Sequence, residues 1–316
     1  MSGNGKVKKC VIPAAGRGDR ISELGINTPK LLLPVANRPL VEYHLEIIQS
    51  AGIKEVVFIL SSSDYISDIK KATGDTFNCE FIIQKQPRGI ADSLGKAKNA
   101  LDSPFLVILG DIYLTPRNIG KQISVFENSD NDALIFIREN EPPESVKKSF
   151  EVSLNKDGTV KKVREKPGTP KNSTRGCGLY IFKESIFNII EETPLSDTRG
   201  EHELTDSIQM LINKGGKVAV AVTGDLDINI NSPQDLLLSN LHQINTTGKS
   251  IISSDSDIHP DTEIIRSVIG SKVKIKNAVK IQNSLLWEGS SLTGFKDVEN
   301  SIVLGEKVFY FPNLQF

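Results

Sequence analysis

Cysteine and histidine are scarce in this chain of 316 residues. The three cysteines, Cys10, Cys79 and Cys177, are far apart and odd in number, so the sequence indicates neither a disulfide framework nor a cysteine metal site. The four histidines do not form a metal-like cluster either. A reducing cytoplasm is therefore the expected location.

The chain also lacks a large net charge and long apolar runs. The formal net charge of −1 gives no general attraction to nucleic acid or to an anionic membrane, so neither is expected as a partner. Apolar runs do not approach the length of a membrane span, and residues 1–9 lack the apolar stretch of a signal peptide. Any recognition of phosphate must therefore be local.

Predicted strands and helices alternate along the first part of the chain. The strands cover residues 7–12, 55–60, 80–84 and 105–109, and the helices cover 40–51, 65–73 and 90–101. Alternation with short connections predicts an α/β fold with a doubly wound, mainly parallel sheet. The apolar and charged fractions, 38% and 24%, are those of a globular protein, and the length suits one large domain and a small one.

A glycine loop follows the first predicted strand, which ends in an apolar run at Ile12. Small residues there leave backbone N–H groups accessible to an anion: Ala14, Ala15, Gly16 and Gly18. Arg20 and Lys30 follow and supply positive charge. The spacing fits neither the P-loop nor the dinucleotide fingerprint, so the loop predicts a polyphosphate cradle of another kind. An ordinary tight strand–helix turn is the alternative.

Two further polar residues end predicted strands. Gln84 ends the third strand, and Asp111 follows the fourth after Gly110. Because ligands of open α/β sheets bind beyond the carboxyl ends of the strands, we expect both residues near the glycine loop.

The tail has a different period. Ile269, Ile275 and Ile281 recur every six residues, and a Ser-aliphatic-aliphatic triplet beginning at Ser267 and Ser284 recurs every seventeen. Such hexads predict a short left-handed parallel β-helix, with a small antiparallel β appendage as the alternative. We therefore expect a catalytic domain at 1–245 and a β-helix domain at 246–316. Open coils leave strand edges that a second copy could cover, so a homo-oligomer is possible.

Eight ordered motifs carry a family resemblance over about residues 7–240. They are Gly16-Arg17-Gly18-Asp19-Arg20, Pro29-Lys30, Leu33-Pro34-Val35, Gln84-Lys85-Gln86-Pro87-Arg88-Gly89-Ile90-Ala91, Gly110-Asp111, Glu165-Lys166-Pro167, Gly178-Leu179-Tyr180 and Glu203-Leu204-Thr205-Asp206. The chain resembles the sugar-1-phosphate nucleotidyltransferases, also called nucleotide-sugar pyrophosphorylases, and most closely the glucose-1-phosphate thymidylyltransferases. The resemblance implies a Rossmann-like nucleotidyltransferase fold with an appended β-helix.

The resemblance also implies a reaction. A sugar 1-phosphate would attack the α-phosphorus of a nucleoside triphosphate in line and release pyrophosphate, with magnesium as the cofactor. Ala14, Ala15, Gly16 and Gly18 would hold the nucleotide, Arg20 the departing β,γ-phosphates, and Lys30 the phosphates at the reacting centre. Asp111 would hold magnesium, since hard carboxylate oxygens suit that ion.

The same resemblance assigns residues to the base of the nucleotide and to the sugar phosphate. Gln84 and Gly89 would select the base, and a Gln-x-x-Pro-x-Gly pattern favours a pyrimidine, dTTP or UTP. Glu165, Lys166 and Gly178 would bind the sugar phosphate, with glucose 1-phosphate as the expected acceptor.

Four positions depart from the family pattern. Asp19 places negative charge in the glycine loop, and Ile112 stands where an asparagine often follows the aspartate. Phe150 stands where a glycine commonly passes the hexose, so the acceptor pocket could differ. The second metal position falls on Asn229, with Asp227 or Asn231 as alternatives.

These departures leave two other functions open. The chain could transfer a nucleotide to another phosphorylated acceptor or use CTP. It could instead be a catalytically weak paralogue that binds nucleotide or nucleotide sugar and regulates an active partner.

Overall fold

Strand β1 (Lys9–Ala14) is buried through its middle, and the rest of the first sheet is built around it. The computed structural model describes residues 5–16, 24–26, 28–197, 199–223, 226–294 and 296–314. The chain forms two units, residues 1–17 with 41–227 and residues 18–40 with 228–316. The second unit thus includes a segment from near the N-terminus, while the functional boundary at 245/246 stays a prediction.

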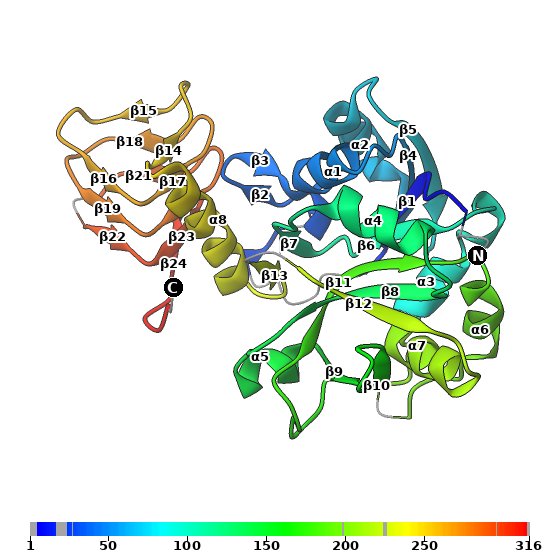
Figure 1. The fold of residues 1–316 in the computed structure, drawn as a ribbon. Coiled ribbons are helices and arrows are strands. Elements are labelled where there is room, and N and C mark those ends of the chain that lie inside the picture. Colours follow the sequence, from blue (N-terminus) through cyan, green and yellow to red (C-terminus); the bar gives the residue numbers. More distant parts are fainter. Residues whose placement is uncertain are drawn as a thin grey trace. The chain divides into compact units, whose positions relative to one another are not determined.

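The first unit is a nine-stranded sheet with helices (Figure 1). Its strands after β1 are β4 (Glu55–Leu60), β5 (Asn78–Ile83), β6 (Phe105–Ile108), β8 (Ala133–Arg138), β9 (Phe150–Leu154), β10 (Val160–Glu165), β11 (Arg175–Phe182) and β12 (Val218–Val222), with the short β7 (Ile112–Leu114) outside that sheet. Its helices are α1 (Leu40–Ser50), η3 (Ser63–Tyr65), α2 (Ile66–Thr73), α3 (Ile90–Gly95), η4 (Lys98–Ala100), α4 (Ile119–Glu127), α5 (Pro143–Lys148), α6 (Ile186–Glu192) and α7 (Leu204–Asn213).

The strand order is β10-β9-β11-β6-β1-β4-β5, with β8 paired to β11 and β12. β1 is parallel to both β4 and β6, and β4 is parallel to β5, as the alternation predicts. The sheet is mixed because β11 runs antiparallel to β6 and β8. Strand order reverses at β1, so the carboxyl ends of β1 and β6 form the crevice where ligands of such sheets bind.

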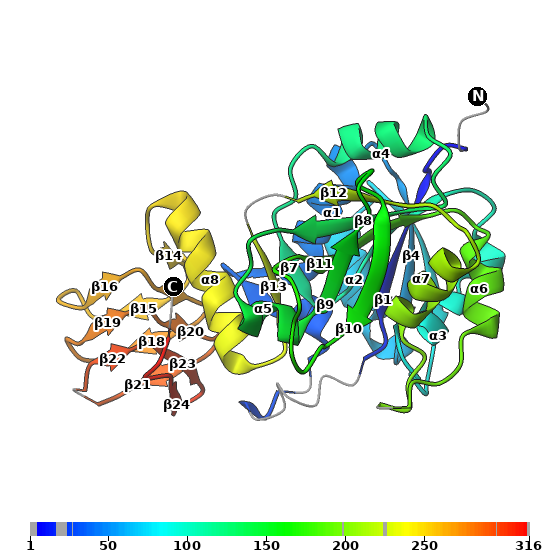
Figure 2. The same ribbon diagram turned by 60° about the horizontal axis from the view of Figure 1, so that its bottom comes forward.

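Helices cover both faces of this sheet (Figure 2). Apolar side chains of α3, α6 and α7 pack on one face against alternate residues of the strands, including Val11, Phe105 and Tyr180. Helices α1 and α4 lie on the other face. Because alternate strand residues face opposite ways, nearly every side chain of the central strands is buried.

Three local expectations differ from the structure. The helix expected at 90–101 ends at Gly95, and a separate 3₁₀ turn, η4, follows. Strand β10 was not predicted, and in it Val160 and Val163 are buried while Lys161 and Lys162 between them are exposed. Helix α4 was not predicted at all.

The second unit begins with η2 (Lys30–Leu32) and a two-strand hairpin, β2 (Pro34–Val35) and β3 (Arg38–Pro39). Asn240, fully buried on α8 (Pro233–Thr247), binds this hairpin. Its Nδ2 donates to the carbonyl of Pro34 over 3.0 Å, and its Oδ1 accepts from the backbone N of Ala36 over 2.8 Å. This amide therefore joins the hairpin to helix α8 within the second unit.

Helix α8 starts with a capping box between Ser232 and Asp235 and has a proline at its first position. It runs to Thr247, two residues beyond the predicted end of the catalytic domain at 245. Gly248 ends the helix in a left-handed conformation, φ 71°, with its N–H bonded to the carbonyl of Ile244.

Short parallel strands make up the tail. They are β14 (Ile251–Ile252), β15 (Asp257–Ile258), β16 (Glu263–Ile265), β17 (Val268–Ile269), β18 (Lys274–Ile275), β19 (Lys280–Gln282), β20 (Leu285–Leu286), β21 (Ser291–Leu292), β22 (Val298–Glu299) and β23 (Ser301–Leu304), and antiparallel β24 (Lys307–Tyr310) follows; β13 (Asp227–Asn229) precedes α8. They pair as three sheets, β14-β17-β20-β23, β15-β18-β21 and β16-β19-β22, as in a parallel β-helix.

The seventeen-residue repeat is the coil length. Ile269 pairs beside Leu286 and Leu286 beside Val303, and these side chains form one apolar row in the core. The antiparallel alternative is therefore wrong for these coils. Serines on the same interval form a ladder, in which Oγ of Ser267 accepts from the N–H of Ser284 and Oγ of Ser284 accepts from the N–H of Ser301, both over 3.1 Å.

None of the described helices is long and apolar enough to cross a membrane.

Candidate active site

The glycine loop and Asp111 lie side by side. The backbone N of Gly110 donates to the carbonyl of Pro13 over 3.1 Å. A Cβ on Gly110 would lie 2.7 Å from the Cβ of Ala14, so only glycine allows this approach. Asp111 thus stands beside the start of the loop, where Ala15 is buried and Gly16 is exposed with open space around it.

Gly178 packs behind the Asp111 turn. Its carbonyl accepts from the N–H of Leu109 over 3.0 Å. Its φ is +67°, and a Cβ there would lie 2.1 Å from Cδ1 of Ile112. Both facts require glycine and give Gly178 a structural reason to be present. Its contact with a sugar phosphate stays a prediction.

His44 contacts the residue that follows Asp111 in the same turn, and the sequence analysis did not identify it. Nε2 of this fully buried ring lies 2.6 Å from the carbonyl of Ile112. Burial lowers the pKa of His44 to about 4, so the ring is neutral at pH 7 and Nε2 carries the proton that it donates. The one available signal was a histidine on a helix rich in apolar residues.

Gln84 follows β5 and is 4% exposed. Its backbone N continues the ladder by donating to the carbonyl of Leu60, over 2.8 Å. Its side-chain Nε2 donates to Oδ2 of Asp92, over 2.7 Å, and its Oε1 has no hydrogen-bond partner among the described residues. The sequence indicated Gln84 and gave no sign of Asp92.

Gly89 is held against a distant segment. Its φ is +111°, and a Cβ there would lie 2.4 Å from the carbonyl oxygen of His202. The N–H of His202 donates to the carbonyl of Arg88, over 2.7 Å, and the N–H of Ala91 donates to the carbonyl of His202, over 3.0 Å. The need for glycine is thus a packing requirement, and contact with a base stays a prediction.

The motif residues Glu165 and Glu203 lie around one guanidinium. Nη1 of Arg199 is 3.6 Å from Oε1 of Glu165 and 2.7 Å from Oε1 of Glu203, while Thr205 donates to Glu165 over 3.1 Å. Burial, followed by the charge of Glu165, raises the pKa of Glu203 to about 7. Burial also raises the pKa of Glu165. The two motifs therefore form one electrostatic cluster.

Lys166 adopts an uncommon backbone conformation. Its φ is +36°, a region that residues with a Cβ rarely adopt, and its N–H donates to the carbonyl of Ser149 over 2.8 Å. Its Nζ is 3.7 Å from Oε1 of Glu165, and its side chain is 42% exposed, so the ammonium remains accessible. Such outliers are typical of functional positions.

Phe150 fills the space over Gly176. A Cβ on Gly176 would lie 1.7 Å from Cζ of Phe150, and the phenylalanine ring stacks on Tyr180 with centroids 6.2 Å apart. Phe150 also pairs with Glu165 across β9 and β10 and is 4% exposed. A large buried ring therefore lies next to the candidate sugar-binding residues.

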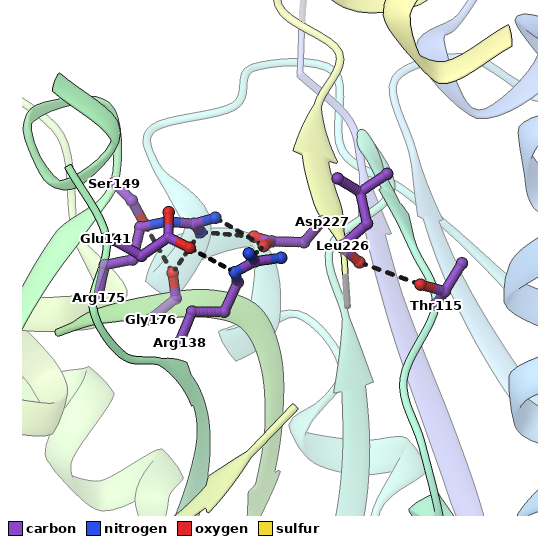
Figure 3. Close-up of polar contacts among 8 residues, drawn as sticks. All are labelled: Thr115, Arg138, Glu141, Ser149, Arg175, Gly176, Leu226 and Asp227. Atoms are coloured by element: carbon purple, nitrogen blue, oxygen red, sulfur yellow. Dashed lines mark hydrogen bonds and ion pairs between the residues drawn. The ribbon is translucent and has the colours of Figure 1, made fainter. Parts of the chain in front are cut away.

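A buried ion pair holds the chain just before Asn229 (Figure 3). Nη1 and Nη2 of Arg175 donate to the two carboxylate oxygens of Asp227, over 2.6 and 2.7 Å. Glu141 accepts from Nε of both Arg175 and Arg138, over 3.0 and 2.6 Å. Because both Asp227 oxygens bind Arg175, Asp227 is a poor alternative metal ligand.

Lys30 and Asn229 belong to the second unit, and Nζ of Lys30 donates to Oδ1 of Asn231 over 2.7 Å. That contact engages Asn231, the other alternative ligand, and leaves Asn229 as the candidate. Gly18, Asp19 and Arg20 lie outside the described residues, so their expected roles stay predictions.

The candidate ligand residues suit a magnesium ion that is bound mainly by water and substrate phosphates. Among the described residues, groups of three or more His, Cys, Asp and Glu side chains that could enclose a metal do not occur. Magnesium needs no such cage, because it keeps several waters and takes one or two carboxylates with substrate phosphates. Asp111, partly buried beside the glycine loop, supplies a carboxylate of this kind.

Comparisons with known proteins agree with this geometry. A family model described as nucleotidyl transferase matches residues 9–228. The low-salt glycan biosynthesis nucleotidyltransferase Agl11 of Haloferax volcanii is 31% identical over 268 residues, covering 82% of this chain and 73% of that protein. A glucose-1-phosphate thymidylyltransferase of Streptomyces griseus is 26% identical, covering 93% of this chain and 91% of its own length.

One solved structure, a UDP-glucose pyrophosphorylase complexed with UDP-glucose, superposes with a TM-score of 0.65 at 21% identity. The match covers 76% of this chain and 99% of that one and shows that the two share a fold. The matched region contains the strand–glycine loop, the Gly110-Asp111 turn and Gln84. The chain therefore belongs to the nucleotidyl transferase family, among its sugar-1-phosphate nucleotidyltransferases.

Proposed function

We propose that the chain transfers a nucleotidyl group from dTTP or UTP to a hexose 1-phosphate and releases pyrophosphate. One observation carries this proposal: the hydrogen bond from Gly110 to Pro13 holds Asp111 against the glycine loop. A carboxylate beside a glycine loop with open space around Gly16 suits a polyphosphate with its cation. The names of two similar proteins, a glucose-1-phosphate thymidylyltransferase and a complex with UDP-glucose, support the substrate class.

The chemistry needs little from the protein beyond alignment. An oxygen of the acceptor phosphate forms a bond to the α-phosphorus as the bond to the pyrophosphate oxygen breaks, so no covalent enzyme intermediate is required. Magnesium, held by Asp111 and Asn229, would neutralise charge on the phosphate oxygens. Backbone N–H groups at Ala14, Ala15 and Gly16 would bind the nucleotide, and Lys30 would bind the phosphates.

Two further groups of residues would bind the base of the nucleotide and the sugar phosphate. Gln84 and Gly89 would select the pyrimidine. Glu165 would accept hydrogen bonds from sugar hydroxyls, and the exposed ammonium of Lys166 would bind the sugar phosphate. Gly18 and Arg20 are proposed for the nucleotide and the leaving pyrophosphate from the sequence alone.

Phe150 favours a second candidate, a nucleotidyltransferase with a different phosphorylated acceptor. Its ring occupies the space over Gly176 next to Glu165, so less room would be left there for a hexose than an open glycine would leave. An acceptor smaller or flatter than glucose 1-phosphate would fit that space better.

Three finer features belong to the same proposal. The hexad period supports left-handed coils, and a crystal structure would test their hand. The exposed edge residues Val308 and Tyr310 support self-association, which ultracentrifugation would test. A cytoplasmic location follows from cysteine usage and is testable by fractionation.

The test is pyrophosphate release across a grid of five nucleoside triphosphates and several sugar 1-phosphates, with magnesium. Asp111→Ala should abolish release, while Asp102→Ala, an exposed aspartate near the same strand, should not. Release that persists in Asp111→Ala would contradict the assigned role. Folded protein that binds nucleotide but is silent across the whole grid would contradict a hexose 1-phosphate acceptor and leave the other-acceptor candidate and the regulatory alternative.

A further inference from the structure

A buried amide presents an unused acceptor. The side chain of Gln84 donates from Nε2 to Oδ2 of Asp92 over 2.7 Å, while Oε1 has no hydrogen-bond partner within the described part of the chain. Gln84 is 4% exposed. Because a buried carbonyl without a partner costs free energy, this oxygen indicates a donor that a bound molecule supplies.

Asp92 allows the amide only one orientation. Its Oδ1 accepts from Nη2 of Arg88 over 3.1 Å and lies 3.5 Å from Nζ of Lys96. Burial raises the pKa of Asp92, but these two cations outweigh it and leave the pKa below its usual value. An ionised carboxylate only accepts hydrogen bonds, so Gln84 must turn its NH₂ group toward Asp92 and its carbonyl away.

The backbone fixes this arrangement before a ligand binds. Asp92 lies in the first turn of α3, where a carboxylate is favoured by the helix dipole. The start of that helix is held by the hydrogen bond from Ala91 to the carbonyl of His202. The side chains of Gln84 and Asp92 are therefore preorganised, which lowers the entropic cost of binding the base.

We infer that Asp92 is a positioning residue that sets nucleotide preference by orienting Gln84. This inference rests on the proposed function, in which Gln84 reads the base. Uracil and thymine carry an N–H at N3 that would donate to the unpartnered carbonyl of Gln84. Cytosine has a lone pair at N3, which leaves both acceptors unsatisfied. One unsatisfied buried acceptor corresponds to about a ten- to hundredfold weaker binding of CTP.

The deciding variant is Asp92→Asn, which has nearly the same shape. Its NH₂ group can donate to Gln84, so the glutamine amide can turn over and present its own NH₂ to the base. Binding of UTP, dTTP and CTP is measured by calorimetry with magnesium and without acceptor. UTP should bind at least threefold more weakly to the variant and CTP at least threefold more tightly, an opposed change that simple structural damage would not produce.

Two controls accompany it. Asp68→Asn alters an exposed aspartate in the first turn of α2 and should leave the UTP/CTP ratio unchanged. Asp92→Glu keeps the carboxylate and should retain the wild-type preference. If Asp92→Asn does not fold, UTP methylated at N3 replaces it: the wild-type protein should bind this probe at least tenfold more weakly than UTP.

The outcomes separate the two proposals. Equal binding of UTP and CTP by the wild type, or an unchanged ratio in Asp92→Asn, overturns the role of Asp92 and leaves the nucleotidyltransferase activity standing. A wild type that binds none of the three nucleotides and releases no pyrophosphate overturns the proposed function, and with it this inference.

Discussion

Arg175 and Asp227 form a two-point ion pair between residues 52 positions apart, with distances of 2.6 and 2.7 Å. Their side chains are 9% and 2% exposed. Removing one partner leaves a buried charge, so Arg175→Met should lower the free energy of unfolding by about 3–5 kcal/mol.

Urea denaturation of Arg175→Met, Asp227→Leu and the double variant checks this prediction. The double variant should cost less than the sum of the two single changes, because it buries no unpaired charge. Strictly additive costs would mean that the pair contributes nothing as a unit.

His44 should make the protein sensitive to acid. Its pKa of about 4 lies below the ordinary 6.5, so the unfolded chain takes up the proton first and stability falls as pH drops from about 6.5 toward 4. Between pH 7 and pH 5 this loss is about 2 kcal/mol. His44→Gln keeps a donor for the carbonyl of Ile112 without the titration. Urea midpoints at the two pH values should therefore differ less in the variant, and equal differences would refute the assignment.

Glu203 should make the protein less stable as pH rises, which is opposite to the effect of His44. Its folded pKa of about 7 exceeds the ordinary 4.5, so its contribution is complete below about pH 4.5 and is lost as pH rises toward 7. Relative to the wild type, Glu203→Gln should become more stable as pH increases across this window. Thermal melts at closely spaced pH values measure the difference, and a constant offset between the two proteins would show that Glu203 does not titrate there.

The serine ladder should be a main support of the coils. Ser284 is fully buried, accepts from the N–H of Ser301 and donates to the carbonyl of Gln282 over 2.7 Å. Ser284→Ala removes the acceptor of the Ser301 N–H, while the carbonyl of Gln282 keeps its bond from the N–H of Asn300, so the change should cost about 1–3 kcal/mol. The exposed Ser254→Ala should stay within about 0.5 kcal/mol of wild type in the same urea titration. Equal costs for both variants would argue against the ladder.

Phe150 should limit the acceptor. Phe150→Ala removes the ring over Gly176, so the KM for hexose 1-phosphates should fall while the KM for the triphosphate stays the same. The cavity should also lower the free energy of unfolding by about 3–5 kcal/mol. Steady-state kinetics at a temperature well below the variant's melting point make the comparison. An unchanged acceptor KM would mean that the ring is only a core residue.

Local signals determined much of what the sequence reveals. Strand and helix periodicities depend on neighbouring residues, so β4 lies at its predicted limits and α1 ends one residue before its predicted end. The seventeen-residue repeat noted in the sequence equals the coil length because each coil stacks on the next with the same residues facing inward. The glycine loop was recognisable for the same reason, since it directly follows a strand in the sequence, whereas the need for glycine at position 110 comes from its approach to Ala14.

Other features required the tertiary structure, because they join segments far apart in the chain. The requirement for glycine at position 89 comes from the backbone of His202, and the charge of Arg175 is compensated by Asp227. Asp92 looks like any exposed helix residue in the sequence, yet its carboxylate orients Gln84. Periodicity and spacing carry no information about such pairings, whose free energy depends on burial and distance that only the folded chain defines.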